Sequence, residues 1–423
     1  MDYFNRKGSA LYCESIPLSF LANKYGTPLY VYSLRTFVRH LTVVSQAFGN
    51  LPHGVFYSAK ANSNLTLLRV AAGLGCGCDV VSLGEYLAAR KAGISKIIFS
   101  GVGKRPEEIE YALKHGLLFF GVESENELKT IEKIARRIGK KAPISLRINP
   151  DVDPQTHPHI ATGLRKEKFG IRTSTAEKLY LDLANSRFLD PVGISMHIGS
   201  QIVGTGPYIE AAEKIREIYC SLMRKKVLLK YIDLGGGWAV PFYRKQKVAM
   251  PADYVRAMLP QLKGLKADFL IEPGRAIVGN AGVLLTKAIN IKRGFNKTFA
   301  IVDAAMNDFI RPALYHAEHR LEPVRAREKS IIEKYDIVGP ICENADAFAR
   351  GIILPQIREG DLLCLFTAGA YGYSMSSNYN SRLRPAEILV DGDKDFLIRE
   401  RESYNDLWRR QRLININPAL PPQ

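Results

Sequence analysis

Between residues 54 and 272, apolar runs typical of buried strands alternate with amphipathic helical segments, and this alternation constrains the fold more than any other feature of the chain. Helical spacing of apolar residues is clearest in Leu83 to Lys91, Pro106 to His115, Glu125 to Ile138, Ala176 to Ala184 and Tyr208 to Lys225. The eight expected strands are Gly54 to Ser58, Cys76 to Val81, Lys96 to Ser100, Leu117 to Val122, Pro143 to Ile148, Val192 to Ile198, Lys230 to Leu234 and Asp268 to Glu272. Such units pair in parallel and fit a closed, TIM-like (β/α)8 barrel better than an open doubly wound sheet, which stays the alternative.

The pattern changes at Gly282. Beyond it, strand-like runs are separated by turns and show little helical periodicity, as in Val283 to Ile291, Thr298 to Val302, Tyr335 to Val338, Asp361 to Phe366 and Ala386 to Val390. This pattern predicts a second, mostly antiparallel β domain. We therefore expect an N-terminal segment of residues 1–30 that contributes to the β domain, a barrel over residues 31–282, and a C-terminal β domain over residues 283–423 that ends in a basic tail.

Composition narrows the class of protein. The chain is 46% hydrophobic and 24% charged, no apolar run approaches a membrane span, and the N-terminus lacks a signal-peptide core, so we expect a cytoplasmic protein that does not enter a membrane. Six scattered cysteines are typical of reduced thiols, and Cys76-Gly77-Cys78 lacks a second pair at zinc-finger spacing, so no metal site is expected. The net charge of +17 is spread along the chain without a nucleic-acid-binding signature, which favours small anionic ligands over nucleic acid.

The first candidate for chemistry is Lys60. The apolar run Val55 to Tyr57 breaks at Ser58, so Lys60 stands just past the end of the first expected strand, where a parallel strand passes into a helix. A lysine there can form a Schiff base with an aldehyde cofactor if its surroundings align it for attack. Taken alone the signal is weak, since most lysines at strand ends are solvated surface charges.

Three further elements follow other expected strands. His197 ends the sixth strand, Gly235-Gly236-Gly237 follows the seventh, and Glu272 closes the eighth. In a barrel these strand ends share one face. By itself, a glycine triplet is more often a tight turn, and a lone histidine in an apolar strand is usually a core residue. Together, a Schiff-base lysine, a phosphate cradle, a carboxylate for a ring nitrogen and a flat side chain for a ring face describe a site for pyridoxal 5'-phosphate.

Five longer motifs then resemble the diaminopimelate decarboxylase family, a pyridoxal-phosphate class built on an alanine-racemase-like barrel. They are Tyr57-Ser58-Ala59-Lys60-Ala61-Asn62, Ser195-Met196-His197-Ile198-Gly199-Ser200-Gln201, Asp233-Leu234-Gly235-Gly236-Gly237, Glu272-Pro273-Gly274-Arg275 and Gly339-Pro340-Ile341-Cys342-Glu343. The segments that most closely resemble this family are Thr156-His157-Pro158, Thr162-Gly163, Lys168-Phe169-Gly170 and Arg311-Pro312-Ala313-Leu314-Tyr315. The resemblance runs from about Tyr3 to about Gly392.

The resemblance implies the activity and the site. The expected reaction is decarboxylation of meso-2,6-diaminopimelate to L-lysine and CO2, the last step of lysine biosynthesis, with Lys60 holding the cofactor and Cys342 returning a proton to Cα. Cys342 and Glu343 match a pair that the family supplies from the other subunit of a homodimer with shared active sites. The implied cofactor-binding residues are Lys60, His197, Ser200, Gly235, Gly236, Gly237, Glu272, Gly274, Arg275 and Tyr371. The implied substrate-binding residues are Arg275, Arg311, Tyr315, Glu343 and Tyr371.

Some residues depart from the family pattern. Asn344-Ala345 replaces the Ser-Gly that usually follows Cys-Glu, which puts fine substrate geometry in doubt, and Gly101-Val102-Gly103-Lys104 differs from its usual Asn-containing form. The latter segment also resembles part of a nucleotide loop, but lacks the full Walker spacing. Two other functions stay open: a decarboxylase of ornithine, arginine or a carboxylated polyamine on the same fold, and a non-catalytic regulator that binds the cofactor.

Overall fold

The computed structural model describes residues 3–154, 156, 162–164, 168–243, 246–327 and 330–414. Its centre is a closed barrel of eight parallel strands, because β8 and β9 pair and join the two ends of the sheet. The strands are β5 (His53–Ser58), β6 (Gly77–Val80), β7 (Ile97–Phe99), β8 (Phe119–Val122), β9 (Ala142–Asn149), β11 (Leu189–Met196), β12 (Tyr231–Asp233) and β13 (Asp268–Ile271), with the short β10 (Ile171–Arg172) beside β9. The barrel prediction is confirmed, and the open sheet is wrong for this chain.

Helices connect the barrel strands and cover them. They are α2 (Leu34–Gln46), α3 (Leu65–Gly73), α4 (Leu83–Lys91), α5 (Pro106–His115), α6 (Glu125–Ile138), α7 (Thr173–Ala184), α8 (Gly206–Arg224) and α9 (Pro251–Leu262). Local sequence fixes their ends: α6 begins where the Ser124 side chain accepts a hydrogen bond from the backbone N–H of Glu127, and ends at Gly139 with a left-handed φ of 68°. Its apolar face buries Leu128 and Ile131.

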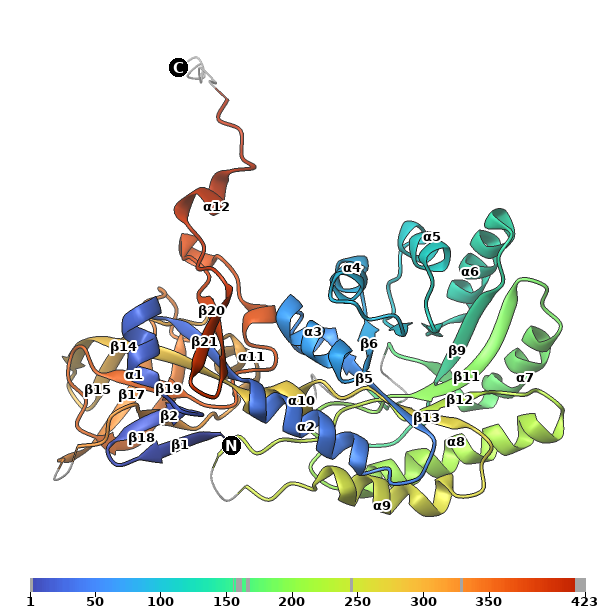
Figure 1. Ribbon diagram of the computed structural model, residues 1–423, viewed down its shortest axis with the longest axis horizontal. Coiled ribbons are helices and arrows are strands. Elements are labelled where there is room, and N and C mark those ends of the chain that lie inside the picture. The colour runs from blue at the N-terminus through green and yellow to red at the C-terminus, as the bar shows by residue number, and fades with distance from the viewer. Residues whose placement is uncertain are drawn as a thin grey trace, which may run out of the picture.

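The second body is a mostly antiparallel β domain, shown at the left of Figure 1 with the barrel at the right. Its main sheet follows the order β18-β17-β15-β14-β4-β20-β21; β19 pairs with β14, and β16 pairs with β19. The strands are β4 (Leu29–Ser33), β14 (Gly282–Arg293), β15 (Thr298–Val302), β16 (Leu321–Pro323), β17 (Ile332–Val338), β18 (Ala347–Pro355), β19 (Leu362–Leu365), β20 (Ala386–Asp391) and β21 (Lys394–Arg399). Among the described strands of this β domain, only β4 with β20 and β15 with β17 pair in parallel.

The N-terminal residues belong to this β domain by their contacts. β1 (Phe4–Lys7), β2 (Ala10–Cys13) and β3 (Ile16–Pro17) form a small antiparallel sheet that leads into α1 (Leu18–Tyr25), and β4 then lies between β14 and β20. The division at residues 30 and 282 stays a prediction. No helix in the described part of the chain is long and apolar enough to cross a membrane.

Short elements complete the connections. They are η1 (Ala59–Ala61), α10 (Arg275–Val278), η3 (Gly279–Ala281), α11 (Arg311–Tyr315), η4 (Tyr373–Met375), η5 (Tyr379–Ser381) and α12 (Tyr404–Trp408). η1 follows β5, and α10 follows β13, so both lie at the carboxyl ends of barrel strands, where side chains of the expected site are found. Residues 157 and 158 of one family motif, and the basic tail beyond residue 414, lie outside the described residues.

Candidate active site

Lys60 is held by a buried acid from the neighbouring strand. The turn η1 follows β5 directly and brings Lys60 Nζ to 2.7 Å from Oδ2 of Asp79, whose side chain is fully buried at the end of β6. The hydroxyl of Ser58 donates to the same oxygen at 2.9 Å. Burial lowers the pKa of Lys60, but attraction to Asp79 and Glu272 outweighs it and raises that pKa. Sequence reasoning missed Asp79, although an acid within the apolar run Cys78-Asp79-Val80 could have indicated it.

Two buried carboxyl groups face each other at the ends of β12 and β13. Asp233 is 2% exposed and Glu272 is 7% exposed. Burial raises the pKa of Asp233 to about 7. Burial and the charges of Asp233 and Asp79 raise the pKa of Glu272 well above its usual range. Two such groups share a proton near neutral pH, and a cationic ring nitrogen beside them would allow both to ionise.

His197 is fixed as a neutral imidazole just after β11. The backbone N–H of Gly236 donates to its Nδ1 at 3.1 Å, so the ring proton lies on Nε2. Burial, together with the positive charges of Arg147 and Lys60, lowers the pKa of His197 well below its usual range. Its carbonyl accepts hydrogen bonds from Arg147 at 3.0 Å and from the Thr162 hydroxyl at 3.0 Å. A flat, uncharged ring is thereby held beside Lys60, with both residues lining one pocket.

The glycine triplet is required by close backbone packing. A Cβ at Gly235 would lie 2.3 Å from the Met196 carbonyl oxygen, and one at Gly236 would lie 2.1 Å from that of Glu272. A Cβ at Gly237 would lie 2.1 Å from the carbonyl oxygen of Gly199. A Cβ at Gly274 would meet that of Ala61 at 2.9 Å, which keeps the turn after β13 close to Lys60. Because these glycines have no side chains, they also leave room for a phosphate. The triplet is therefore compatible with a phosphate site, but by itself it does not indicate one.

Two arginines are buried in this region without a carboxylate partner among the described residues. Arg275 in α10 is 5% exposed, donates to the Ser200 hydroxyl at 3.2 Å, and lies over the Tyr371 ring at 4.7 Å. Arg311 in α11 is 4% exposed and lies over the Tyr315 ring at 5.3 Å. Burial, reinforced by the charge of Arg275, lowers the pKa of Arg311 to about 9.

Both guanidinium groups also lie over the ring of Phe242, at 5.8 Å and 5.6 Å, so that residue joins them into one cluster that sequence reasoning missed. The Nε atom of each arginine has no hydrogen-bond partner. Buried cations of this kind fit anionic ligands, because a carboxylate or phosphate accepts two parallel hydrogen bonds from a guanidinium group.

Cys342 and Glu343 are predicted site residues that lie on the surface of the chain. Both are exposed on the loop between β17 and β18, and neither lines the pocket of about 210 Å³ around Lys60. The Asn380 amide donates to Cys342 Sγ at 3.4 Å, and the Tyr379 hydroxyl donates to Glu343. These two side chains are therefore displayed on the surface of the chain that carries them.

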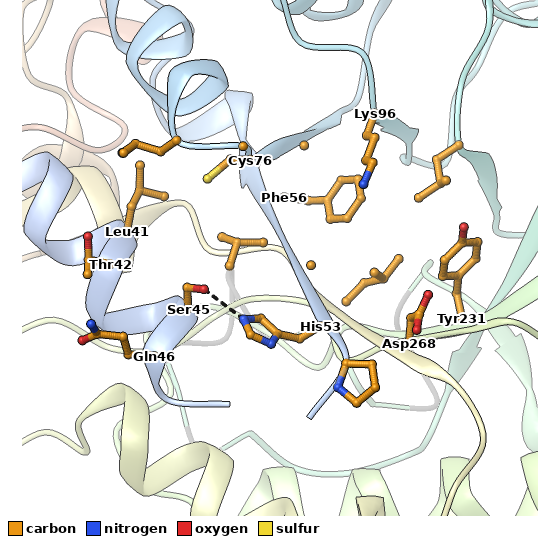
Figure 2. Close-up of a pocket in the computed structure, with 18 of the residues that line it drawn as sticks. Leu41, Thr42, Ser45, Gln46, His53, Phe56, Cys76, Lys96, Tyr231 and Asp268 are labelled. Atoms are coloured by element: carbon orange, nitrogen blue, oxygen red, sulfur yellow. Dashed lines mark hydrogen bonds between the residues drawn. The ribbon is translucent and has the colours of Figure 1, made fainter. Parts of the chain in front are cut away.

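A larger cavity of about 680 Å³ lies at the opposite, amino-terminal mouth of the barrel (Figure 2). Its lysines, Lys96 and Lys230, are exposed, and both ring nitrogens of His53 are engaged, by the Ser45 hydroxyl at 2.9 Å and the Leu51 carbonyl at 2.8 Å. Phe56 forms part of its floor. Reactive groups do not converge there as they do at the carboxyl ends of the strands.

The loop that partly resembles a nucleotide-binding loop has a structural role. The Lys104 side chain is completely buried. It donates to the carbonyls of Gly101 and Gly121 at 2.7 Å and 2.6 Å and to Glu127 at 2.6 Å. All three donors of the ammonium group are used. The lysine therefore ties this loop to β8 and α6, and no donor is left for a phosphate.

A closed parallel barrel with a partly buried lysine paired to a buried acid, a carboxyl pair for a ring nitrogen and glycines that leave room for a phosphate defines the class of pyridoxal-phosphate-dependent barrel enzymes. Residues 34–279 match the family model described as the pyridoxal binding domain of pyridoxal-dependent decarboxylases. Full-length relatives define the family more closely. The chain is 46% identical to diaminopimelate decarboxylase of Vibrio cholerae, with 98% of this chain and 100% of the relative covered. It is 44% identical to that of Pseudomonas aeruginosa over the same shares.

The crystal structure of diaminopimelate decarboxylase from Helicobacter pylori complexed with L-lysine superposes with a TM-score of 0.89 at 43% identity, covering 93% of this chain and 98% of that one. The chain belongs to the diaminopimelate decarboxylase family. Its cofactor is pyridoxal phosphate.

Proposed function

We propose that this chain decarboxylates meso-2,6-diaminopimelate to L-lysine and CO2 in the cytoplasm, as the last step of lysine biosynthesis. The single observation that carries the substrate is the pair of buried arginines, Arg275 and Arg311, which have no carboxylate partner among the described residues. The substrate has a second amino-acid group that needs a cation for its carboxylate, whereas ornithine, arginine and plain polyamines lack that group. The names of the relatives and the lysine bound to the Helicobacter pylori enzyme support the same choice.

Residues of the barrel would hold the cofactor. When bound, pyridoxal phosphate would supply an electron sink for the electron pair left at Cα as CO2 departs. Lys60 would carry it between turnovers, and Asp79 pairs with the ammonium of Lys60 when that lysine is free. Glu272, with Asp233 beside it, would keep the ring nitrogen protonated. The residues assigned to its ring face and phosphate are His197, Ser200, Gly235, Gly236, Gly237, Gly274 and Arg275.

Residues of the β domain would handle the substrate. Arg311 and Tyr315, with Arg275 from the barrel, bind the distal carboxylate. Tyr371 contacts both cofactor and substrate, and Glu343 pairs with the distal ammonium. The Cys342 thiol gives its proton to Cα after CO2 has left, with retention of the electron pair on sulfur. Because the loop of Cys342 and Glu343 is exposed and does not line the pocket around the chain's own Lys60, we propose that it enters the site of a second copy in a homodimer.

The test is a panel of amino acids with CO2 release as readout. It includes meso-diaminopimelate, its LL isomer, lysine, ornithine, arginine and a carboxylated polyamine. We expect release from the meso compound alone at high efficiency, with the D centre as the site of reaction. Equal efficiency on ornithine or arginine would overturn the substrate, and no release from any of them would favour a regulator that binds the cofactor without reacting.

A further inference from the structure

The turn from Ser377 to Ser381 is built against the two side chains that the proposed dimer would share. Asn380 Nδ2 donates to Cys342 Sγ at 3.4 Å. Tyr379, the preceding residue, donates its hydroxyl to Glu343. Two consecutive residues of one turn therefore contact two consecutive residues of the other loop, in opposite order along the chain.

The backbone of this turn is held in an uncommon conformation. Asn380 and Ser381 adopt left-handed φ angles of 55° and 54°, which asparagine tolerates better than most residues other than glycine. The turn is anchored at its start, because the Ser377 N–H donates to the Asn307 carbonyl at 2.9 Å and the Asn307 amide donates back at 3.4 Å. Such conformations persist where surrounding contacts fix them, and they concentrate at functional sites.

The opposite loop is fixed by Asp346, which is 3% exposed. Its carboxylate accepts the N–H of Ile341 at 2.8 Å and that of Met306 at 2.7 Å, while its own N–H donates to the Glu343 carbonyl at 3.0 Å. The residues on either side of Cys342 are thus held by one buried side chain. The contact between the Asn380 amide and the sulfur therefore joins two loops that are each fixed independently.

We propose that Asn380 is a positioning residue for Cys342, which holds the sulfur in one place and stabilises the thiolate formed when the thiol gives up its proton. The inference rests on the proposed function, in which the S–H bond breaks, the proton goes to Cα, and the electron pair stays on sulfur until solvent returns a proton. An N–H donor stabilises the anion more than the neutral thiol. Among the described residues, the other charged or titratable groups near the loop include Glu343, Tyr379 and Asp346. Arg350 donates to the Asn344 carbonyl, and the charge of Arg382 acts on Asp346.

The first experiment measures alkylation of Cys342 by iodoacetamide against pH in the cofactor-loaded enzyme. The rate is read on the peptide that contains Cys342, because Cys76 and Cys220 are also partly accessible. Asn380→Gly keeps the left-handed backbone and removes the donor, and it should move the midpoint of the rate profile upward by about half to one pH unit. Asn380→Asp keeps the shape but replaces the donor by an anion, so its upward shift should be larger.

Asn378→Asp is the matched control, since Asn378 lies in the same turn but donates to the Arg382 carbonyl and Glu402. It adds the same charge without touching the sulfur and should leave the midpoint in place. Unchanged midpoints in both Asn380 variants, or an equal shift in Asn378→Asp, would overturn the proposal.

The second readout is steady-state decarboxylation. Asn380→Gly should lower kcat by about threefold to tenfold with KM within twofold, because the contact acts on the proton donor and not on substrate binding. A raised KM at unchanged kcat would refute this role. If the wild-type chain releases no CO2 from any amino acid, the proposed function fails, while the alkylation profiles still decide whether Asn380 controls the thiol.

Discussion

Replacing Arg311 by leucine separates a ligand-binding role from a structural one, because the two roles predict opposite effects on the free energy of unfolding. Burial and the charge of Arg275 lower the pKa of Arg311 to about 9. This lowering of the pKa from the usual arginine value corresponds to a free-energy cost on the order of 5 kcal/mol for keeping the side chain charged in the folded state at neutral pH. The cost is fully present at pH 7 and is relieved only as the pH rises through about 9.

The unfolded chain does not bear this cost, so Arg311→Leu should leave the cofactor-free protein as stable as before or more stable, by up to a few kcal/mol. The same substitution should lower the activity. Loss of a charge-assisted contact with a carboxylate removes about 3 kcal/mol, which is a fall in kcat/KM on meso-diaminopimelate of about a hundredfold or more. Urea unfolding of the cofactor-free protein and CO2 release from the loaded enzyme measure the two effects, and cofactor absorbance should be unaltered.

Arg320→Leu is the control for this prediction. Arg320 pairs with Glu322 at 2.8 Å and lies over the Phe366 ring at 3.9 Å, so its removal should lower stability and leave kcat/KM within a few-fold. Full activity in Arg311→Leu would refute the ligand-binding role. A loss of more than about 2 kcal/mol in the stability of cofactor-free Arg311→Leu would refute the reasoning from an uncompensated buried charge.

Three further outcomes are expected. Lys60→Ala should lose the visible absorbance of the bound cofactor, and borohydride should no longer fix the cofactor to protein; retention of either would mean that another group carries it. Mixing inactive Lys60→Ala with inactive Cys342→Ala should restore part of the activity through hybrid dimers, and no recovery after verified subunit exchange would contradict the shared site. Because the folded-state pKa of Asp233 is raised to about 7, the cofactor-free protein should lose stability as pH rises from about 4 to 7, and urea titrations of Asp233→Asn should show a shallower fall.

Much of the barrel could be predicted because local patterns agree with its topology. The expected segments Leu83 to Lys91, Pro106 to His115 and Glu125 to Ile138 coincide with α4, α5 and α6, where apolar spacing is regular and the ends are capped. β18 was not foreseen. Gly351 with a φ of 63° and register shifts against β17 interrupt its alternation, so no strand period is visible in the sequence.

The chemistry of the site was only partly visible. Residues in distinctive motifs, such as Lys60 and Glu272, could be named from the sequence because strand ends carry them to one face. An acid within an apolar run could have drawn attention to Asp79, but its contact with Lys60, like that of Phe242 with the two arginines, joins segments that are separate in the chain. Roles that depend on such tertiary contacts cannot be assigned from a local pattern in the sequence.

The position of β4 has a consequence for how the chain acquires its structure during synthesis. This strand leaves the ribosome before the whole barrel, but its neighbours β14 and β20 are made only after the barrel is finished. Its apolar residues, Leu29 to Tyr32, are fully buried in the final sheet. During synthesis they remain unpaired until β14 and β20 have been made. The barrel strands can meet in the order in which they emerge, whereas the β domain cannot close until residue 391 has been translated. A nascent chain stalled before β14 should therefore hold a barrel and an exposed apolar strand, which makes this N-terminal segment the natural place for a chaperone to bind.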